Sequence, residues 1–291
     1  MVSSLNGKSF RSMRIPSTHS YCSTALIAVL LLCALPGRLY GQIVNGEQVV
    51  RAELVTAADD FTKPFLVGVK FAMQQGWYLY WKNPGDAGLP VEVTWSLPEG
   101  YTAGELQFPT PSKFVYDDLI AYGYKNELVL FAEIRPPGTP AASVPALRAN
   151  LDWLVCKESC VRGRAEVVLA PATLQGTTLA TNGRLLKKWR NLLPGPLSSV
   201  SLQISKPTVE GGGGKRKVSF TVRGDGAEDV TDFYPLGLNN AAIDHKSITV
   251  KQNTVSFEIV PYTEGETIPT IKGLLIARGK AYECMVVLPV M

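Results

Sequence analysis

The chain is poor in the residues that build metal centres and thioredoxin-type redox sites. Its 291 residues include 2 histidines and 5 cysteines, and no two cysteines have C-x-x-C spacing. That absence excludes a thioredoxin-type site. The histidine beyond the N-terminal segment, His245, lies in the polar stretch NNAAIDHKS, and we expect it on the surface. Zinc is usually held by four nitrogen or sulfur ligands, so no metal site is predicted.

Long apolar runs are scarce too, and the one that bears on targeting lies near the N-terminus. Ala25–Leu35 contains eleven residues, whereas crossing a bilayer takes about 20. Small Gly41 follows the run, and basic residues precede it, namely Lys8, Arg11 and Arg14. These features predict a signal peptide at residues 1–41 and export of the remainder to the periplasm or a similar compartment. An uncleaved anchor is the alternative, and the large leucines before Cys33 disfavour a lipoprotein.

The chain beyond the signal has no excess of charge. Residues 1–41 hold four of the 29 Lys and Arg and no Asp or Glu, which leaves 25 basic against 25 acidic residues. The balance gives no support for a nucleic-acid partner. A glycine run at Gly211–Gly214 is followed by KRKVSFTV, not by the Lys-Ser/Thr and helix of a phosphate-binding loop. We therefore expect no small-molecule cofactor.

The chain also lacks the alternation of strands and helices that builds a parallel sheet. Apolar residues instead alternate within short runs, such as PFLVGVKFA (Pro64–Ala72), VEVTW (Val91–Trp95) and ELVLFAEI (Glu127–Ile134). Turn signals such as NPGD and LPEG separate the runs. Period-two alternation over short segments predicts an all-β fold with an antiparallel β-sandwich over residues 42–173.

One later segment has a helical pattern instead. Within Leu179–Leu193, apolar residues recur at helical spacing, at Leu185, Leu186, Trp189, Leu192 and Leu193. The PGP that follows ends the helix. We predict an amphipathic helix and linker over residues 174–196. The strand pattern then resumes, which predicts a second β-sandwich-like domain over residues 197–291.

The cysteines of the exported part raise three possibilities. Cys156 and Cys160 are separated by Lys-Glu-Ser, and Cys284 is left over on a mostly apolar strand face, where an inert buried thiol is expected. In an extended strand, residues four apart lie about 13 Å from each other. A disulfide needs Cα atoms within about 4.4–6.8 Å, so Lys-Glu-Ser must turn the chain, and a hairpin tip is expected. A bond closing so short a loop stabilises little. A redox pair is therefore favoured, while a structural brace and a Cu(I)-binding dithiol stay open.

Five ordered blocks resemble one known family, the N-terminal periplasmic domain of the thiol:disulfide interchange protein DsbD, in its ScsB-like branch. The blocks are GWYLYWKNPGDAGLP (Gly76–Pro90), WSLPEGY (Trp95–Tyr101), FPTPSKF (Phe108–Phe114), YGYKNE (Tyr122–Glu127) and DWLVCKESCV (Asp152–Val161). The resemblance implies an immunoglobulin-like sandwich that carries a redox-active disulfide. It also implies a thiol–disulfide oxidoreductase that relays electrons from a membrane reductase to periplasmic thiol proteins.

The resemblance further implies roles for individual residues. Cys160 would form the mixed disulfide with partners, and Cys156 would be the resolving thiol. A cap loop shields the disulfide in this family, and Ala121–Tyr124 resembles it. The expected shielding residues are Tyr78, Tyr80, Tyr122 and Tyr124. The family's membrane-embedded and thioredoxin-like portions are missing from this sequence. The expected partners are therefore a separate membrane-embedded thiol reductase and thioredoxin-like or disulfide isomerase proteins.

Overall fold

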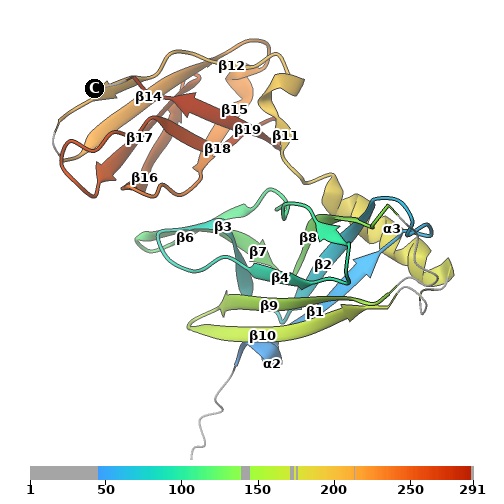
Figure 1. Cartoon of the computed structure of the whole chain (residues 1–291). Coiled ribbons are helices and arrows are strands. Elements are labelled where there is room, and N and C mark those ends of the chain that lie inside the picture. Colours follow the sequence, from blue (N-terminus) through green and yellow to red (C-terminus); the bar gives the residue numbers. More distant parts are fainter. Residues whose placement is uncertain (1–44, 139–144, 171–173, 175, 213, 290–291) are drawn as a thin grey trace, which may run out of the picture. The chain divides into compact units, whose positions relative to one another are not determined.

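The computed structural model describes residues 45–138, 145–170, 174, 176–212 and 214–289 (Figure 1). The predicted signal peptide, including Cys33, lies outside these residues. No helix in the described part of the chain is long and apolar enough to cross a membrane. Strands dominate the described residues, which confirms the prediction of an all-β fold.

Two antiparallel sheets form an N-terminal sandwich. In spatial order, the first sheet contains β1 (Val50–Thr56), β2 (Phe65–Met73), β8 (Glu127–Arg135) and β5 (Thr102–Ala103). The second contains β10 (Cys160–Leu169), β9 (Leu147–Cys156), β3 (Tyr78–Gly85), β7 (Leu119–Lys125) and β6 (Ser112–Tyr116), and β4 (Glu92–Ser96) also pairs with β9. Short, antiparallel strands in two layers are the arrangement of an immunoglobulin-like sandwich.

The core of this sandwich is built from alternate residues of each strand. Val67, Val69 and Phe71 of β2 are fully buried, as their spacing predicts. Trp153 of β9 meets Phe71 edge to face, with ring centroids 5.8 Å apart. A pair in this geometry contributes about 0.5–1.5 kcal/mol beyond the burial of its area. The other face of β3 and β9 points away from this core and carries the site described below.

The predicted helix is present as α3 (Gly176–Arg190). Leu186 and Trp189 are buried, and the Trp189 indole N–H donates to Glu127 Oε1 at 3.0 Å. Leu192 was expected on the apolar face but is 44% exposed, because the helix ends before it, at Arg190. One apolar stripe therefore fastens α3 to the N-terminal sandwich.

A C-terminal sandwich follows the helix. One sheet contains β11 (Gly195–Pro196), β19 (Lys280–Val287), β18 (Thr270–Ala277) and β15 (Val230–Pro235). The other contains β12 (Gln203–Ile204), β14 (Arg216–Arg223), β17 (Thr254–Pro261) and β16 (Ala241–Lys251), with β13 (Thr208–Glu210) paired to β14. Phe233 from the first sheet packs against Phe220 and Phe257 from the second. This second β unit was also expected from the strand pattern.

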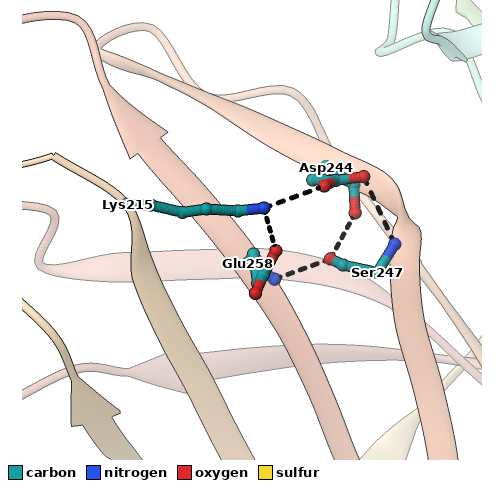
Figure 2. Close-up of polar contacts among 4 residues, drawn as sticks. All are labelled: Lys215, Asp244, Ser247 and Glu258. Carbon is teal, nitrogen blue, oxygen red and sulfur yellow. Dashed lines mark hydrogen bonds and ion pairs between the residues drawn. The ribbon is translucent and has the colours of Figure 1, made fainter.

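A bulge interrupts β16 between Asp244 and Thr249 (Figure 2). Ser247 fixes it, because its hydroxyl donates to the Asp244 carbonyl at 2.6 Å and accepts from the Glu258 N–H at 2.8 Å. Lys215 bridges the Asp244 and Glu258 carboxylates. The bulge contains His245, which is 6% exposed, so its expected surface position is wrong. Polar neighbours in the sequence suggested solvent, but the burial comes from β7, which is distant in the chain.

A close backbone approach holds the N-terminal sandwich at its edge. The short helix α2 (Gly46–Val49) lies so near β10 that a Cβ on Gly46 would sit 2.5 Å from Gly163 Cα. A Cβ on Gly163 would in turn lie 2.5 Å from the buried ring of Trp153. Only glycine fits at both positions without a shift of the neighbours.

We predict that Gly163→Ala destabilises the protein by about 1–3 kcal/mol, because it overpacks a filled site. Gly183→Ala is the control. Gly183 lies within helix α3, and a Cβ added there would meet only the Cβ of Ala57, at 3.7 Å. Replacing glycine in a helix by alanine should stabilise by about 0.5–1 kcal/mol. Urea unfolding midpoints of both variants test the pair. Equal midpoints would contradict the close approach.

Candidate functional site

The cysteine pair closes the tip of the β9–β10 hairpin. Cys156 is the last residue of β9 and Cys160 the first of β10, and the two are directly opposite in the antiparallel ladder. Their Cα atoms are 4.1 Å apart and their sulfurs are bonded. The Lys157 N–H donates to the Ser159 carbonyl at 3.1 Å within the turn. Lys-Glu-Ser therefore makes the turn that the sequence required.

The two sulfurs have different environments. Cys156 is 1% exposed, whereas Cys160 is an exposed residue. Thiol–disulfide exchange proceeds by attack of a thiolate on one sulfur of the bond, with the other sulfur as leaving group. The exposure difference leaves Cys160 more accessible than Cys156 to an attacking thiolate.

Two tyrosines of β3 lie against the disulfide. Tyr78 is directly opposite Cys156 in the ladder of β3 and β9. The Tyr80 hydroxyl donates to Cys156 Sγ at 3.1 Å and lies 3.7 Å from Cys160 Sγ. The hydroxyls of Tyr78 and Tyr80 are 3.3 Å apart. Burial raises the pKa of both phenols, so both remain protonated donors near neutral pH.

A second layer of aromatic rings, from the β6–β7 hairpin, packs on Tyr78. Tyr78 packs against Phe114 at 5.4 Å and stacks on Tyr116 at 5.7 Å between ring centroids. The Lys125 ammonium lies 4.5 Å from the centroid of Phe114. We call Phe114 and Tyr116 the aromatic cap. Sequence reasoning missed both residues, although their alternation in SKFVY was a usable signal.

The structure brings only two of the four expected shielding tyrosines to the disulfide. Tyr78 and Tyr80 lie there, but Tyr122 and Tyr124 are on the opposite face of the same sheet. Tyr124 is paired with Leu79, a core residue, and its hydroxyl donates to the Pro109 carbonyl at 2.6 Å. Successive residues of a strand point to opposite faces. The small or flexible side chains of β7 therefore take the disulfide side, namely Ala121, Gly123 and Lys125.

No group of three or more His, Cys, Asp or Glu residues that could hold a metal ion occurs among the described residues. Cys284 is buried in the C-terminal sandwich, and its thiol lies 3.6 Å from the Gly273 carbonyl. Burial raises the pKa of this thiol to about 12, so it is unreactive near neutral pH. The reactive chemistry of the described cysteines is confined to the hairpin tip.

Comparison with known families agrees with this geometry. Residues 43–172 match the family model described as thiol:disulfide interchange protein DsbD, N-terminal. These residues form a DsbD N-terminal-like domain. The resemblance seen in the sequence is thereby confirmed, and the family together with the bonded cysteine pair supports a thiol–disulfide exchange module.

The fold likeness extends beyond the DsbD N-terminal-like domain. The crystal structure of the N-terminal periplasmic domain of ScsB from Proteus mirabilis matches with a TM-score of 0.62 and 16% sequence identity. The match covers 83% of this chain and 93% of that chain, and at this identity it shows the fold alone. The comparison with curated proteins found no significant match.

We predict that removing the aromatic cap exposes the disulfide to small reductants. Aromatic contacts are worth about 1 kcal/mol, so Phe114→Ala with Tyr116→Ala should speed reduction by dithiothreitol about fivefold or more. Val115→Ala is the matched control, because Val115 lies between the two on the hairpin's other face and is 67% exposed. Stopped-flow or quenched-alkylation kinetics measure the rates. Equal rates in the cap variant and the control would show that the rings do not limit access.

We predict that the Tyr80 hydroxyl lowers the pKa of the reduced cysteine pair. A donor to a thiolate favours the charged form, so Tyr80→Phe should raise the thiol pKa, by about one unit if the bond is worth about 1.4 kcal/mol. Tyr78→Phe should change it less, because Tyr78 contacts the Tyr80 hydroxyl, not the sulfur. The pH dependence of iodoacetamide alkylation gives both values. Identical shifts in the two variants would count against a direct role for Tyr80.

Proposed function

We propose that this chain is an exported redox module that relays electrons through Cys156 and Cys160 between a membrane thiol reductase and periplasmic thiol proteins. The observation that carries the proposal is the asymmetric disulfide, with an exposed Cys160 and a buried, hydrogen-bonded Cys156. A brace needs no such asymmetry. An exchange site does, because it must offer one sulfur and stabilise the other.

The delivery half of the cycle starts from the dithiol. The Cys160 thiolate attacks a partner disulfide, which forms a mixed disulfide and releases one partner thiolate. The Cys156 thiolate then attacks Cys160 Sγ, which releases the second partner thiolate and restores the Cys156–Cys160 bond. The partner gains two electrons and, on protonation of its thiolates, two protons.

The recharging half runs through the same atoms. A thiolate of the electron donor attacks Cys160 Sγ, and Cys156 leaves as a thiolate. The Tyr80 hydroxyl, 3.1 Å from that sulfur, donates to the leaving thiolate. The second thiol of the donor then attacks the mixed disulfide and frees Cys160. A leaving thiolate that is hydrogen-bonded leaves faster, because its conjugate thiol has a lower pKa.

The expected partners follow from the chemistry and the family. A donor must present a dithiol that reaches a hairpin tip, as thioredoxin-like proteins do, and an acceptor must carry an accessible disulfide. The signal-like N-terminus and the periplasmic origin of the similar ScsB domain support action in the periplasm.

We predict that Cys156→Ser traps partners and Cys160→Ser does not. With Cys156 removed, the mixed disulfide on the exposed Cys160 cannot resolve, so covalent complexes should accumulate on non-reducing gels of cell extracts. Cys160→Ser is the matched control, because the remaining Cys156 is buried. Trapping by Cys160→Ser alone would reverse the assigned roles.

A redox titration separates the module from a structural brace. The purified protein, equilibrated with glutathione or thioredoxin buffers, should have a reduction potential above about −300 mV, the range of exchangeable disulfides. A potential well below that value, together with no trapped partner, would indicate a structural bond. Cu(I) titration of the reduced protein tests the alternative of copper handling directly.

A further inference from the structure

The two faces of the β6–β7 hairpin make different contacts. On one face, Phe114 lies opposite Ala121 in the ladder and forms part of the aromatic cap. On the other face, the adjacent ladder pair is Lys113 and Tyr122. Both of these residues contact the C-terminal sandwich. The segment that packs on Tyr78 beside the disulfide is therefore contacted on its other face by residues more than 100 positions later in the chain.

The contact between Lys113 and Asp232 is the polar anchor of this arrangement. Lys113 Nζ lies 3.0 Å from Asp232 Oδ2, and the two side chains are only 23% and 22% exposed. The other oxygen, Asp232 Oδ1, accepts the Phe233 N–H at 2.8 Å, which orients the carboxylate within β15. Because both side chains are mostly covered by protein, dissolved salt screens this ion pair less than a pair on the surface.

Tyr122 provides the apolar part of the same contact. It is fully buried, 4.8 Å from Tyr234 and 5.4 Å from His245 between ring centroids. Its hydroxyl lies 3.4 Å from His245 Nδ1. The β16 bulge that Ser247 fixes contains His245 and also Lys246, which lies 3.0 Å from the exposed Asp118 at the hairpin turn.

Further contacts join the sandwiches beside the hairpin. Asn83 of β3 is buried, and its amide N–H donates to the Pro235 carbonyl at 2.6 Å. Leu274 and Ala281 of the C-terminal sandwich are buried in the same cluster as the core of the N-terminal sandwich. The residues behind the hairpin thus belong to a packed interface, so the anchor has a fixed support.

We propose that Asp232 is a positioning residue for the exchange reaction, holding Lys113 and so keeping the aromatic cap packed on Tyr78 beside the disulfide. Asp232 acts through the hairpin and does not touch the sulfurs. The proposal rests on the proposed function only in that access to the disulfide must be controlled. The C-terminal sandwich then influences how fast thiols react with the disulfide, in addition to any part in partner binding.

The hairpin's position makes this control effective. Strand β6 lies at the edge of its sheet and pairs with β7 alone. Edge segments with few partners open locally at low free-energy cost. Attack through a local opening is proportional to the population of the open form, so each contact that holds the hairpin closed slows the reaction.

The test compares disulfide reduction rates in the purified full chain. Asp232→Asn removes the charge but keeps an oxygen for the Phe233 N–H, and it should speed reduction by dithiothreitol about fivefold. Lys113→Met breaks the same contact from the other side and should have the same effect. The double variant should be no faster than either single variant, because all three lose one interaction.

Two controls make the comparison specific. Asp229→Asn removes the ion pair with Arg278, also in the C-terminal sandwich, and should leave the rate unchanged. In the Phe114→Ala/Tyr116→Ala background, Asp232→Asn should add no acceleration, because the cap through which it acts is gone. A merely structural role would accelerate reduction in both backgrounds. Unfolding midpoints check that each variant is folded, and Lys113→Met serves alone if Asp232→Asn does not fold.

The outcomes separate this proposal from the proposed function. Unchanged rates in Asp232→Asn and Lys113→Met, or equal acceleration without the cap, overturn the positioning role even if Cys156→Ser traps partners. A potential below about −300 mV with no trapping overturns the relay, yet the rate comparison still reports whether Asp232 holds the cap. Faster reduction that depends on the cap supports the positioning role.

Discussion

The register of β9 against β10 and β3 is the constraint on which the site depends. Pairing with β10 sets Cys156 opposite Cys160, and pairing with β3 sets Tyr78 opposite Cys156. A shift by one residue would send Tyr78 and Tyr80 into the core and bring Leu79 to the sulfurs. The shift is prevented because Leu79 and Trp81 fill the sandwich core from the other face. Core packing thus fixes the chemistry of the disulfide without touching it.

The same alternation gives the β6–β7 hairpin its two roles. Rings that point one way cover the tyrosines beside the sulfurs, and a lysine and a tyrosine that point the other way meet the C-terminal sandwich. Neither role needs a separate element. The cost is that β6 must serve as an edge strand, which is the least supported position in a sheet. The proposed closed position of the hairpin therefore depends on its side-chain contacts more than on the hydrogen bonds between β6 and β7.

Much of this could be predicted from particular residues. Alternation in PFLVGVKFA identified β2, the spacing of Leu186 and Trp189 identified α3, and Lys-Glu-Ser between two apolar runs identified the hairpin tip. Each of these signals is local. The first two depend on the spacing of apolar residues along a strand or helix, and the third depends on the distance that a few residues can span. The resemblance then predicted roles for the cysteines, and Tyr78 and Tyr80 lie beside the disulfide, as it also predicted.

The tyrosines and the histidine that were misplaced are residues whose surroundings are set by distant segments. Tyr122 and Tyr124 share one face of a strand, but only the pairing with β3 decides which face meets the disulfide. His245 lies among polar neighbours in sequence and is buried by a tyrosine 123 positions earlier. A sequence shows which residues of one strand share a face. Which faces of two paired strands lie on the same side of the sheet depends on their register, which is a tertiary property.

Burial of Cys156 affects both how easily this sulfur leaves and how easily it is reached. It disfavours a thiolate and so slows departure of this sulfur. The Tyr80 hydroxyl offsets that penalty at the one atom that must carry the charge. The buried sulfur also stays out of reach of other oxidants and thiols, so an external thiolate attacks Cys160 more readily. On the proposed mechanism, selectivity comes from the aromatic cap, which packs on Tyr78 beside Cys156, and from the contacts behind the hairpin that hold the cap in place.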